Sequence, residues 1–517
     1  MISWARNFLL ASPLTISLSY AVTVDIPVSV PSGAPMASGS LFSLSIEQDR
    51  WLDWAGNTSR NEFFFNTLDN LIQITGEPPQ IRIGADSGGS YKFQRGATGD
   101  AQLVFPDPSA TVPYPEADKI VVGNAYYEAA RFLPRNTHII WGVNFGENNI
   151  TAAVLEAQAI RKAFDSPAVK DAGVILDFVE IGNEANVYTR NRLRSPDFNI
   201  SEYVKEWSSF AQNVSTAAGI SSSSHVKFWG GSFADSLFGT AGFSTQNMLS
   251  NGILDSPEGK LITTAFSLEN DGLLQDLMAK STIRSNLTIF SPDITAVKNQ
   301  GLDYVLGETN NCPLHGVPGV SNVAGAALWA LDYALFARQI GVTRVFFHQG
   351  IGYRYNMIQP LTLTRSALDA SNLSTPLPPH IQPPYYAAVI AAEAIGNGGN
   401  TQIIELTVNS TKVAGYGFFT GGRIARAVFI NSEAFLATTA ERTSVHIDLS
   451  FDSEGPTSMD IKRLAIEHAD DVSGLTWGGV SYETDDARPS GEETIETVDI
   501  SDGFDISATE VVMLSFR

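Results

Sequence analysis

Short apolar runs and longer helical segments alternate along the chain from about residue 40 to residue 348. The runs are rich in β-branched and aromatic residues, which is typical of parallel strands buried on both faces. The expected strands are Leu41–Ile46, Gln80–Gly84, His138–Val143, Asp177–Ile181, Val226–Trp229, Lys260–Phe266, Tyr304–Gly307 and Arg344–Phe347. Apolar residues at helical spacing predict intervening helices at Ile150–Phe164, at Ser201–Ala218 with a serine cap, and at Val323–Gln339.

Eight strands with intervening helices predict a (β/α)8 TIM barrel, since such barrels take about 250 residues before insertions. A doubly wound open sheet is the alternative, but no G-x-G-x-x-G motif opens a helix after the first strand. From Asp86 to about Pro115 the chain reads as neither strand nor helix. This Gly/Pro-rich insertion is expected on the C-terminal face of the barrel, where active sites lie.

The character of the chain changes after Tyr355. A Pro-rich loop at residues 359–384 leads to one helix at Tyr385–Ile395, and short alternating strands follow from about residue 400. This pattern predicts a β-sandwich domain, and we expect the strand-like run Val22–Val30 to join it. The predicted organisation is an N-terminal strand over residues 22–37, a barrel over 38–397 and a β-sandwich over 398–517.

Residues 1–21 have the pattern of a signal peptide. Arg6 precedes the mostly apolar run Asn7–Ser17, and the small-x-small sequence Ser19-Tyr20-Ala21 follows. A buried first strand or helix is the alternative. Asn-x-Ser/Thr sequons agree with export to the extracellular side and predict glycosylation. They begin at Asn57, Asn149, Asn199, Asn213, Asn286, Asn372 and Asn409.

Charge and cysteine content exclude several classes of function. The chain has 517 residues, with 33 Lys and Arg against 55 Asp and Glu, and a formal net charge of −22. Such a chain repels nucleic acid and anionic membranes, and no run approaches the roughly 20 apolar residues of a transmembrane helix. Cys312 is the only cysteine, and no Cys/His cluster has metal-ligand spacing. We expect no metal, cofactor or obligate protein partner.

The strongest local signal is a hydrophobic strand, Phe178–Ile181, that ends in Gly-Asn-Glu. Residues at the carboxyl end of a barrel strand face the cleft, where Glu184 could protonate a leaving oxygen if its pKa is raised. Asn183 could bond a sugar hydroxyl beside it. The alternative is an ordinary Asn-Glu helix start.

A second short apolar strand, Tyr304–Gly307, ends in Glu308. By strand count Glu308 lies on the seventh strand and Glu184 on the fourth. Two carboxyl groups about 5–5.5 Å apart can flank a glycosidic bond, so that the second attacks the anomeric carbon and configuration is retained. The pair predicts a retaining glycoside hydrolase that acts on a carbohydrate.

The chain resembles clan A of the glycoside hydrolases and, more narrowly, glycoside hydrolase family 79, the β-glucuronidase and heparanase family. It is most similar in pattern to the fungal exo-acting members. The resemblance spans the whole mature chain and rests on FSLSIEQDRWLDWAG at Phe42–Gly56, IRIGADS at Ile81–Ser87, WGVNFG at Trp141–Gly146, VEIGNEANVY at Val179–Tyr188 and VLGETNN at Val305–Asn311.

The resemblance implies roles for individual residues. It makes Glu184 the acid/base and Glu308 the nucleophile. It implies that Glu47 contacts sugar hydroxyls and that Tyr355, or Tyr353 close by, meets the substrate carboxylate. The backbone around Asn311 is the other contact that it implies for the carboxylate.

One stretch departs from the family pattern. After strand six the family shows a His-x-Tyr-like sequence, whereas Phe266–Asp271 here reads FSLEND. In this clan a tyrosine hydroxyl commonly bonds the nucleophile, so the departure bears on sugar specificity. Glu269 is a further carboxylate in this stretch, and we expect it to face solvent.

Four other polar residues have structural interpretations. Arg82 and Glu180 lie inside strands two and four, where a buried ion pair is expected and direct substrate contact is the alternative. His348 ends strand eight and either lines the cleft or is structural. Cys312 is expected to be structural, because no base for a thiol nucleophile is evident.

The sequence therefore predicts a secreted, exo-acting β-glucuronidase that releases glucuronic acid, or its 4-O-methyl form, from glycan side chains. Hydrolysis of a neutral β-glycoside, an endo-acting heparanase-like activity and non-catalytic carbohydrate binding are the alternatives.

Overall fold

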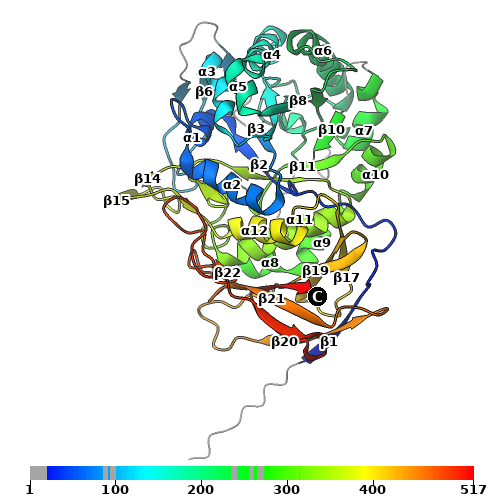
Figure 1. Ribbon diagram of the computed structural model, residues 1–517. Helices are drawn as coiled ribbons and strands as arrows, with labels where there is room; N and C mark the ends of the chain where they lie inside the picture. The colour runs from blue at the N-terminus through cyan, green and yellow to red at the C-terminus, as the bar shows by residue number, and fades with distance from the viewer. Residues whose placement is uncertain are drawn as a thin grey trace, which may run out of the picture.

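The computed structural model describes residues 20–85, 91–93, 101–234, 242–255, 261–264, 273–313 and 315–517. Residues 1–19 of the leader predicted over residues 1–21 lie outside these ranges, whereas its last two residues, Tyr20 and Ala21, begin a strand. The departure at Phe266–Asp271, with Glu269, also lies outside these ranges. Figure 1 shows a unit of strands surrounded by helices above a second unit built from β-strands. Helices α11 (Ala324–Ile340) and α12 (Pro384–Ile395) lie between the two.

Eight parallel strands form a closed barrel, which confirms the predicted (β/α)8 fold. In barrel order they are β2 (Phe42–Glu47), β3 (Ile81–Gly84), β7 (His138–Val143), β8 (Ile175–Ile181), β9 (Lys227–Trp229), β10 (Leu261–Thr264), β11 (Tyr304–Thr309) and β12 (Val345–Gln349). β12 pairs with β2 and closes the ring. Ile140, Trp229, Val305 and Phe346 form a separate buried cluster from four barrel strands.

Helices follow the strands around the barrel. The longer ones are α2 (Glu62–Thr75), α4 (Ile150–Asp165), α6 (Ile200–Ala218), α9 (Lys280–Thr288) and α10 (Ser291–Asn299). The predicted serine cap of α6 is wrong, because Asn199 caps it by accepting from the backbone N–H groups of Ser201 and Glu202. Short helices complete the set: α1 (Trp51–Ala55), α3 (Asn124–Glu128), α5 (Pro167–Ala172), α7 (Thr245–Ser250) and α8 (Leu274–Met278).

The insertion after β3 contains a small sheet made of β4 (Tyr91–Phe93), β6 (Lys119–Val122) and β5 (Gln102–Val104). The prediction of an irregular segment is therefore wrong for β4 and β5. These strands are too short to show a recognisable alternation of apolar and polar residues. The backbone N–H of Ala117 donates to Asp49 Oδ2 at 2.9 Å, which ties the end of this insertion to the segment that follows β2.

The second unit is a β-sandwich, as predicted. One sheet has the order β17 (Thr401–Leu406), β18 (Val413–Thr420), β19 (Arg423–Asn431), β25 (Glu510–Phe516), β21 (Ser458–Ala465) and β22 (Thr476–Trp477), with β23 (Glu496–Asp499) beside β21. The other has the order β1 (Tyr20–Ile26), β20 (Ser444–Phe451) and β24 (Phe504–Ser507). β1 runs parallel to β20. Val24, Phe429, Ile447, Ile506 and Val512 are buried in the core that the two sheets share.

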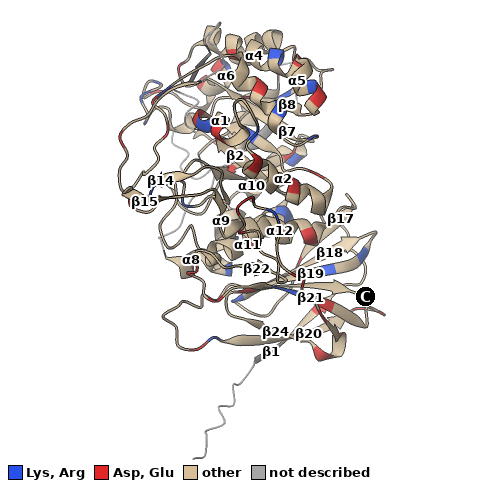
Figure 2. Ribbon diagram, turned by 60° about the vertical axis from the view of Figure 1, so that its left-hand side comes forward, with Lys and Arg blue, Asp and Glu red and all other residues tan. Residues whose placement is uncertain are grey.

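Two hairpin-like pairs link the units, β13 (Ile358–Gln359) with β16 (His380–Ile381), and β14 (Leu363–Arg365) with β15 (Asn372–Leu377). Figure 2 shows charged residues on the outer helices and loops of both units. Among the described residues, no helix is long and apolar enough to cross a membrane.

Candidate active site

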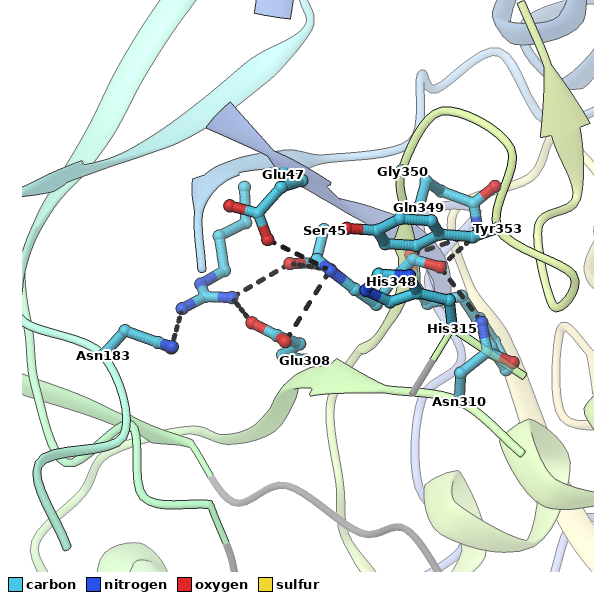
Figure 3. Close-up of polar contacts among 12 residues, drawn as sticks. Ser45, Glu47, Asn183, Glu308, Asn310, His315, His348, Gln349, Gly350 and Tyr353 are labelled. Carbon is cyan, nitrogen blue, oxygen red and sulfur yellow. Dashed lines mark hydrogen bonds and ion pairs between the residues drawn. The ribbon is translucent and has the colours of Figure 1, made fainter. Parts of the chain in front are cut away.

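Arg82 on β3 is the centre of a polar network at the carboxyl ends of the barrel strands. Its Nη1 donates to Glu308 Oε2 at 2.6 Å, and its Nη2 donates to Asn183 Oδ1 at 2.6 Å. Nη1 also donates to Ser45 Oγ at 2.9 Å (Figure 3). One guanidinium group therefore fixes the predicted nucleophile and the residue that precedes the predicted acid.

The predicted buried ion pair between Arg82 and Glu180 is confirmed. Arg82 Nε and Nη2 donate to the two oxygens of Glu180 at 2.8 and 2.9 Å, and both side chains are 1% exposed. Burial disfavours the charged form of Arg82, but Glu180 and Glu308 outweigh it and raise the arginine pKa. Ser232 Oγ donates a further hydrogen bond to Glu180. The guanidinium group of Arg82 is thus held in one orientation.

Two glycines leave room for this ion pair. A Cβ at Gly84 would lie 3.1 Å from Glu180 Oε2, and a Cβ at Gly142 would lie 3.8 Å from the same atom. The second would also come within 3.4 Å of the Gly84 backbone. A side chain at position 84 would therefore crowd the Glu180 carboxylate that bonds Arg82, whereas one at position 142 would only contact it.

Glu184 follows β8 in a turn of unusual backbone conformation. Gly182 has φ +79°, and a Cβ there would lie 2.7 Å from the ring of Phe145. Glu184 itself has φ 49° and ψ 42°, a left-handed conformation that non-glycine residues adopt at a cost of about 1–3 kcal/mol. Its backbone N–H donates to the carbonyl of Ser232 at 2.7 Å. Such strain is frequent at functional positions, and Glu184 lines a pocket with Asn183 and Glu180.

His348, at the end of β12, lies between two carboxylates. Its Nδ1 is 3.8 Å from Glu308 Oε1, and its Nε2 is 3.6 Å from Glu47 Oε2. Nδ1 is also 3.3 Å from Ser45 Oγ. The predicted sugar-contacting Glu47 is 1% exposed, so that its position is set by these neighbours. The structure therefore places His348 in the site rather than behind it.

The loop after Glu308 is packed against the loop after β12. Asn310 donates from its amide nitrogen to the carbonyls of His348 at 3.0 Å and Tyr355 at 3.3 Å. The backbone N–H of Asn311 donates to Asn310 Oδ1 at 3.0 Å. The Asn311 side chain is buried, and neither of its polar atoms has a hydrogen-bond partner in the described part of the chain. Buried amides without partners are costly, which makes Asn311 a candidate for contact with a ligand.

Tyr353 and Tyr355 both lie in the site, at right angles to one another with ring centroids 5.7 Å apart. Tyr353 stacks on His315 with centroids 3.6 Å apart and an interplanar angle of 9°. Its hydroxyl donates to Glu116 Oε1 at 2.8 Å, and His315 Nε2 contacts the same oxygen. Figure 3 shows the hydroxyl end of Tyr353 directed toward Glu47 and His348.

Sequence reasoning missed several residues of the site. The bond from Arg82 to Glu308, the Ser232 contact and the pair formed by Glu116 and His315 were not expected. Of these residues, only His315 could have been suspected from the local sequence, since it lies in the loop that follows Glu308. Cys312 is buried, and burial raises the pKa of its thiol, in agreement with a structural role. Within the described ranges, no group of three or more His, Cys, Asp or Glu side chains could hold a metal ion.

Comparison with known proteins finds similar glycoside hydrolases. Residues 415–513 match the model of the glycosyl hydrolase family 79 C-terminal beta domain. A β-glucuronidase from Aspergillus niger is 25% identical over 495 residues, covering 89% of this chain and 86% of the relative. A β-glucuronidase from Neurospora crassa is 25% identical over 534 residues, covering 91% and 89%. The chain is thus similar to β-glucuronidases over about nine-tenths of its length, and its C-terminal domain matches that of glycosyl hydrolase family 79.

Solved structures share the fold of this protein. A 4-O-α-L-rhamnosyl-β-D-glucuronidase from Fusarium oxysporum 12S superimposes with a TM-score of 0.77 and 21% identity, covering 96% of this chain and all of the other. A GH51 arabinofuranosidase from Xanthomonas axonopodis pv. citri gives a TM-score of 0.60 at 13% identity, covering 96% and 100%. The barrel with its β-sandwich is therefore common to glycosidases beyond family 79.

Proposed function

We propose that this protein is a retaining, exo-acting β-glucuronidase that releases glucuronic acid, or its 4-O-methyl form, from glycans. The observation that carries the proposal is the Arg82 guanidinium, which bonds both Glu308 and the Asn183 that precedes Glu184. The two relatives that carry the name β-glucuronidase align over about nine-tenths of this chain. Together they support one reaction at these two glutamates.

In the proposed first step, Glu308 attacks the anomeric carbon while Glu184 donates a proton to the glycosidic oxygen. A glycosyl ester on Glu308 forms and the aglycone leaves with that proton. In the second step Glu184 removes a proton from water, and the water oxygen displaces Glu308 from the anomeric carbon. The side chain of Glu184 thus alternates between acid and base.

Arg82 suits the charge changes on Glu308. A fixed guanidinium aims the Glu308 carboxylate before the attack, and it is in place to bond that carboxylate again when the ester is hydrolysed. Asn183 is held by the same group and lines the pocket beside Glu184. Glu47 would accept hydrogen bonds from sugar hydroxyls on the opposite side of the site.

The uronate carboxylate is proposed to bind between the loops that follow Glu308 and β12. The buried amide of Asn311, whose atoms lack partners in the described chain, supports this placement. Tyr353 and Tyr355 lie on the other side of it. A neutral β-glycoside is a second candidate substrate, because the Tyr353 hydroxyl already donates to an internal carboxylate, that of Glu116.

The proposal is tested by hydrolysis of 4-nitrophenyl β-D-glucuronide, β-D-glucoside and β-D-galactoside. We expect turnover of the glucuronide with retained configuration, monitored by NMR of the first-formed anomer. Glu308→Ala should abolish turnover, and Glu184→Ala should regain it with azide, which replaces the base-assisted water. Full turnover by Glu308→Ala would overturn the assigned nucleophile, and turnover of only the neutral glycosides would overturn the uronate specificity.

We also propose that the protein is secreted and glycosylated. The sequon asparagines at positions 57, 149, 213, 372 and 409 are exposed, and those at 199 and 286 are half-buried. None of these asparagines is buried, and N-glycosylation requires an accessible asparagine. Protein from the culture medium of a eukaryotic host should lose mass when treated with an N-glycosidase. Retention of the whole product inside the cell would contradict secretion.

A further inference from the structure

Two donors at the rim of the proposed uronate site already hold a carboxylate. The Tyr353 hydroxyl donates to Glu116 Oε1 at 2.8 Å, and His315 Nε2 contacts the same oxygen. The two rings stack face to face, so that their polar ends converge on one point. This arrangement has the chemistry of a carboxylate-binding site, with a phenol and an imidazole N–H as its donors.

The two donors are fixed. Tyr353 is 2% exposed, and a Cβ at Gly350 would lie 2.2 Å from its ring, so that the ring lies directly against the backbone. Arg354, the next residue, donates to the carbonyls of Thr111 and Gly316 at 3.0 and 3.1 Å, which fixes the loop against its neighbours. These contacts hold Tyr353 and its loop independently of Glu116.

Glu116 is held less firmly than its donors. It lies in the insertion before β6 rather than on a barrel strand, and 29% of its side chain is exposed. Burial would raise the pKa of Glu116, but the bonds from His315 and Tyr353 hold it at about 2. The side chain is therefore a carboxylate at every pH at which the enzyme would be assayed.

We propose that Glu116 occupies, in the free enzyme, the position that the carboxylate of a uronate substrate takes, and that substrate displaces it from Tyr353 and His315. Each donor has one proton to offer, so that the two carboxylates cannot share both donors. Two like charges at one point also repel in a site of low dielectric. Glu116 thereby sets the preference of the enzyme between uronates and neutral sugars. This inference rests on the proposed function, since it assumes a uronate at the site.

The test is Glu116→Gln, which keeps an acceptor for Tyr353 and removes the charge. We expect KM for 4-nitrophenyl β-D-glucuronide to fall about tenfold with little change in kcat, which corresponds to ~1.4 kcal/mol of binding. KM for the β-D-glucoside should not change. The matched control is Asp118→Asn, which removes an exposed charge from the same segment and should leave both KM values as they are.

An unchanged or higher KM for the glucuronide in Glu116→Gln, with the thermal unfolding midpoint of the wild type, would overturn the inference. Failure of the proposed function gives a different result, in which the wild type hydrolyses only the glucoside. In that event a gain of glucuronide hydrolysis by Glu116→Gln would still support the inference, and no gain would overturn it. Equal effects of Glu116→Gln and Asp118→Asn would assign the change to net charge and overturn the specific role.

Discussion

Arg82 Nη1 lies 2.6 Å from Oε2 of Glu308, while two other nitrogens of the same guanidinium bond both oxygens of Glu180. Arg82 therefore forms a structural ion pair with Glu180 and also bonds the proposed nucleophile, Glu308. Its two tasks depend on different donors of one side chain, so that a substitution at position 82 affects both.

We expect Arg82→Met to lower kcat by about 10²–10³, the usual loss when a preorganised donor is removed. It should also destabilise the fold by about 3–5 kcal/mol, because Glu180 would be buried without its cation. Turnover of an aryl glucuronide and urea unfolding measure the two effects. Arg60→Met removes an exposed ion pair with Glu62 and should cost about 0–1 kcal/mol. A folded Arg82→Met variant with normal kcat would contradict the role at Glu308.

The position of His348 leads to a second prediction. Its imidazole lies between Glu47 and Glu308, and we expect His348→Gln to lower kcat about tenfold with a smaller change in stability, because the carboxylates lose a shared polar partner. The rate of covalent labelling of Glu308 by a 2-fluoro glycoside reports the same step. His225→Gln removes an exposed histidine that pairs with Asp177 and serves as the control. Equal kcat values for both variants would refute the prediction.

Glu156 on α4 predicts an unusual dependence of stability on pH. Burial raises its pKa well above the ordinary value of 4.5, while the backbone N–H of Asn144 donates to Oε2 at 2.7 Å and lowers it in part. The folded chain therefore keeps this proton where the unfolded chain releases it. The contribution of Glu156 to stability is complete below about pH 4.5 and is lost as the pH rises toward the folded pKa.

Glu156→Gln should remove this loss, because an amide stays neutral and still accepts from Asn144. We expect the variant to lose less stability than the wild type between about pH 5 and 7, where one such group contributes a slope of up to ~1.4 kcal/mol per pH unit. Thermal unfolding across this range measures it. Glu441→Gln changes an exposed residue and should follow the wild type. Parallel curves for wild type and Glu156→Gln would show that Glu156 is ionised in the folded chain.

Arg284 joins the barrel to the β-sandwich. It donates to Asp332 Oδ2 on α11 at 2.5 Å and to Glu405 Oε1 on β17 at 2.7 Å, and Asp332 is 1% exposed. Arg284→Met should destabilise the protein by about 3–5 kcal/mol, since it leaves Asp332 without its cation. Calorimetry should show whether the two units then unfold separately. Arg161→Met, at an exposed pair with Asp165, is expected to change stability by less than about 1 kcal/mol.

Much of this architecture could be predicted because strand and helix patterns are local. The strands that carry Glu184 and Glu308 are short and apolar, and their glutamates follow directly, so that chain position alone placed both at one end of a barrel. The buried pair of Arg82 and Glu180 was also predictable, since a charge inside an apolar strand needs a partner.

The contacts that determine specificity were not predictable in the same way. Glu116 meets Tyr353 and His315 only through tertiary folding, because it lies on an insertion whose strands are three or four residues long. Arg82 could be paired with Glu180 by composition, but nothing local indicated that its third nitrogen would reach Glu308. Such contacts depend on the register of the barrel and the path of its loops.

The parallel pairing of β1 with β20 has a consequence for synthesis in the cell. Strand β1 has no partner in its sheet until β20 leaves the ribosome, and the whole barrel lies between them in the sequence. At about 5–20 residues per second this wait lasts roughly 20–80 seconds, long enough for the barrel to form first. During that time the apolar face of β1 is exposed near the nascent N-terminus. Newly made chains should therefore depend on chaperones that bind single hydrophobic strands, and circular permutants that begin after β1 should depend on them less.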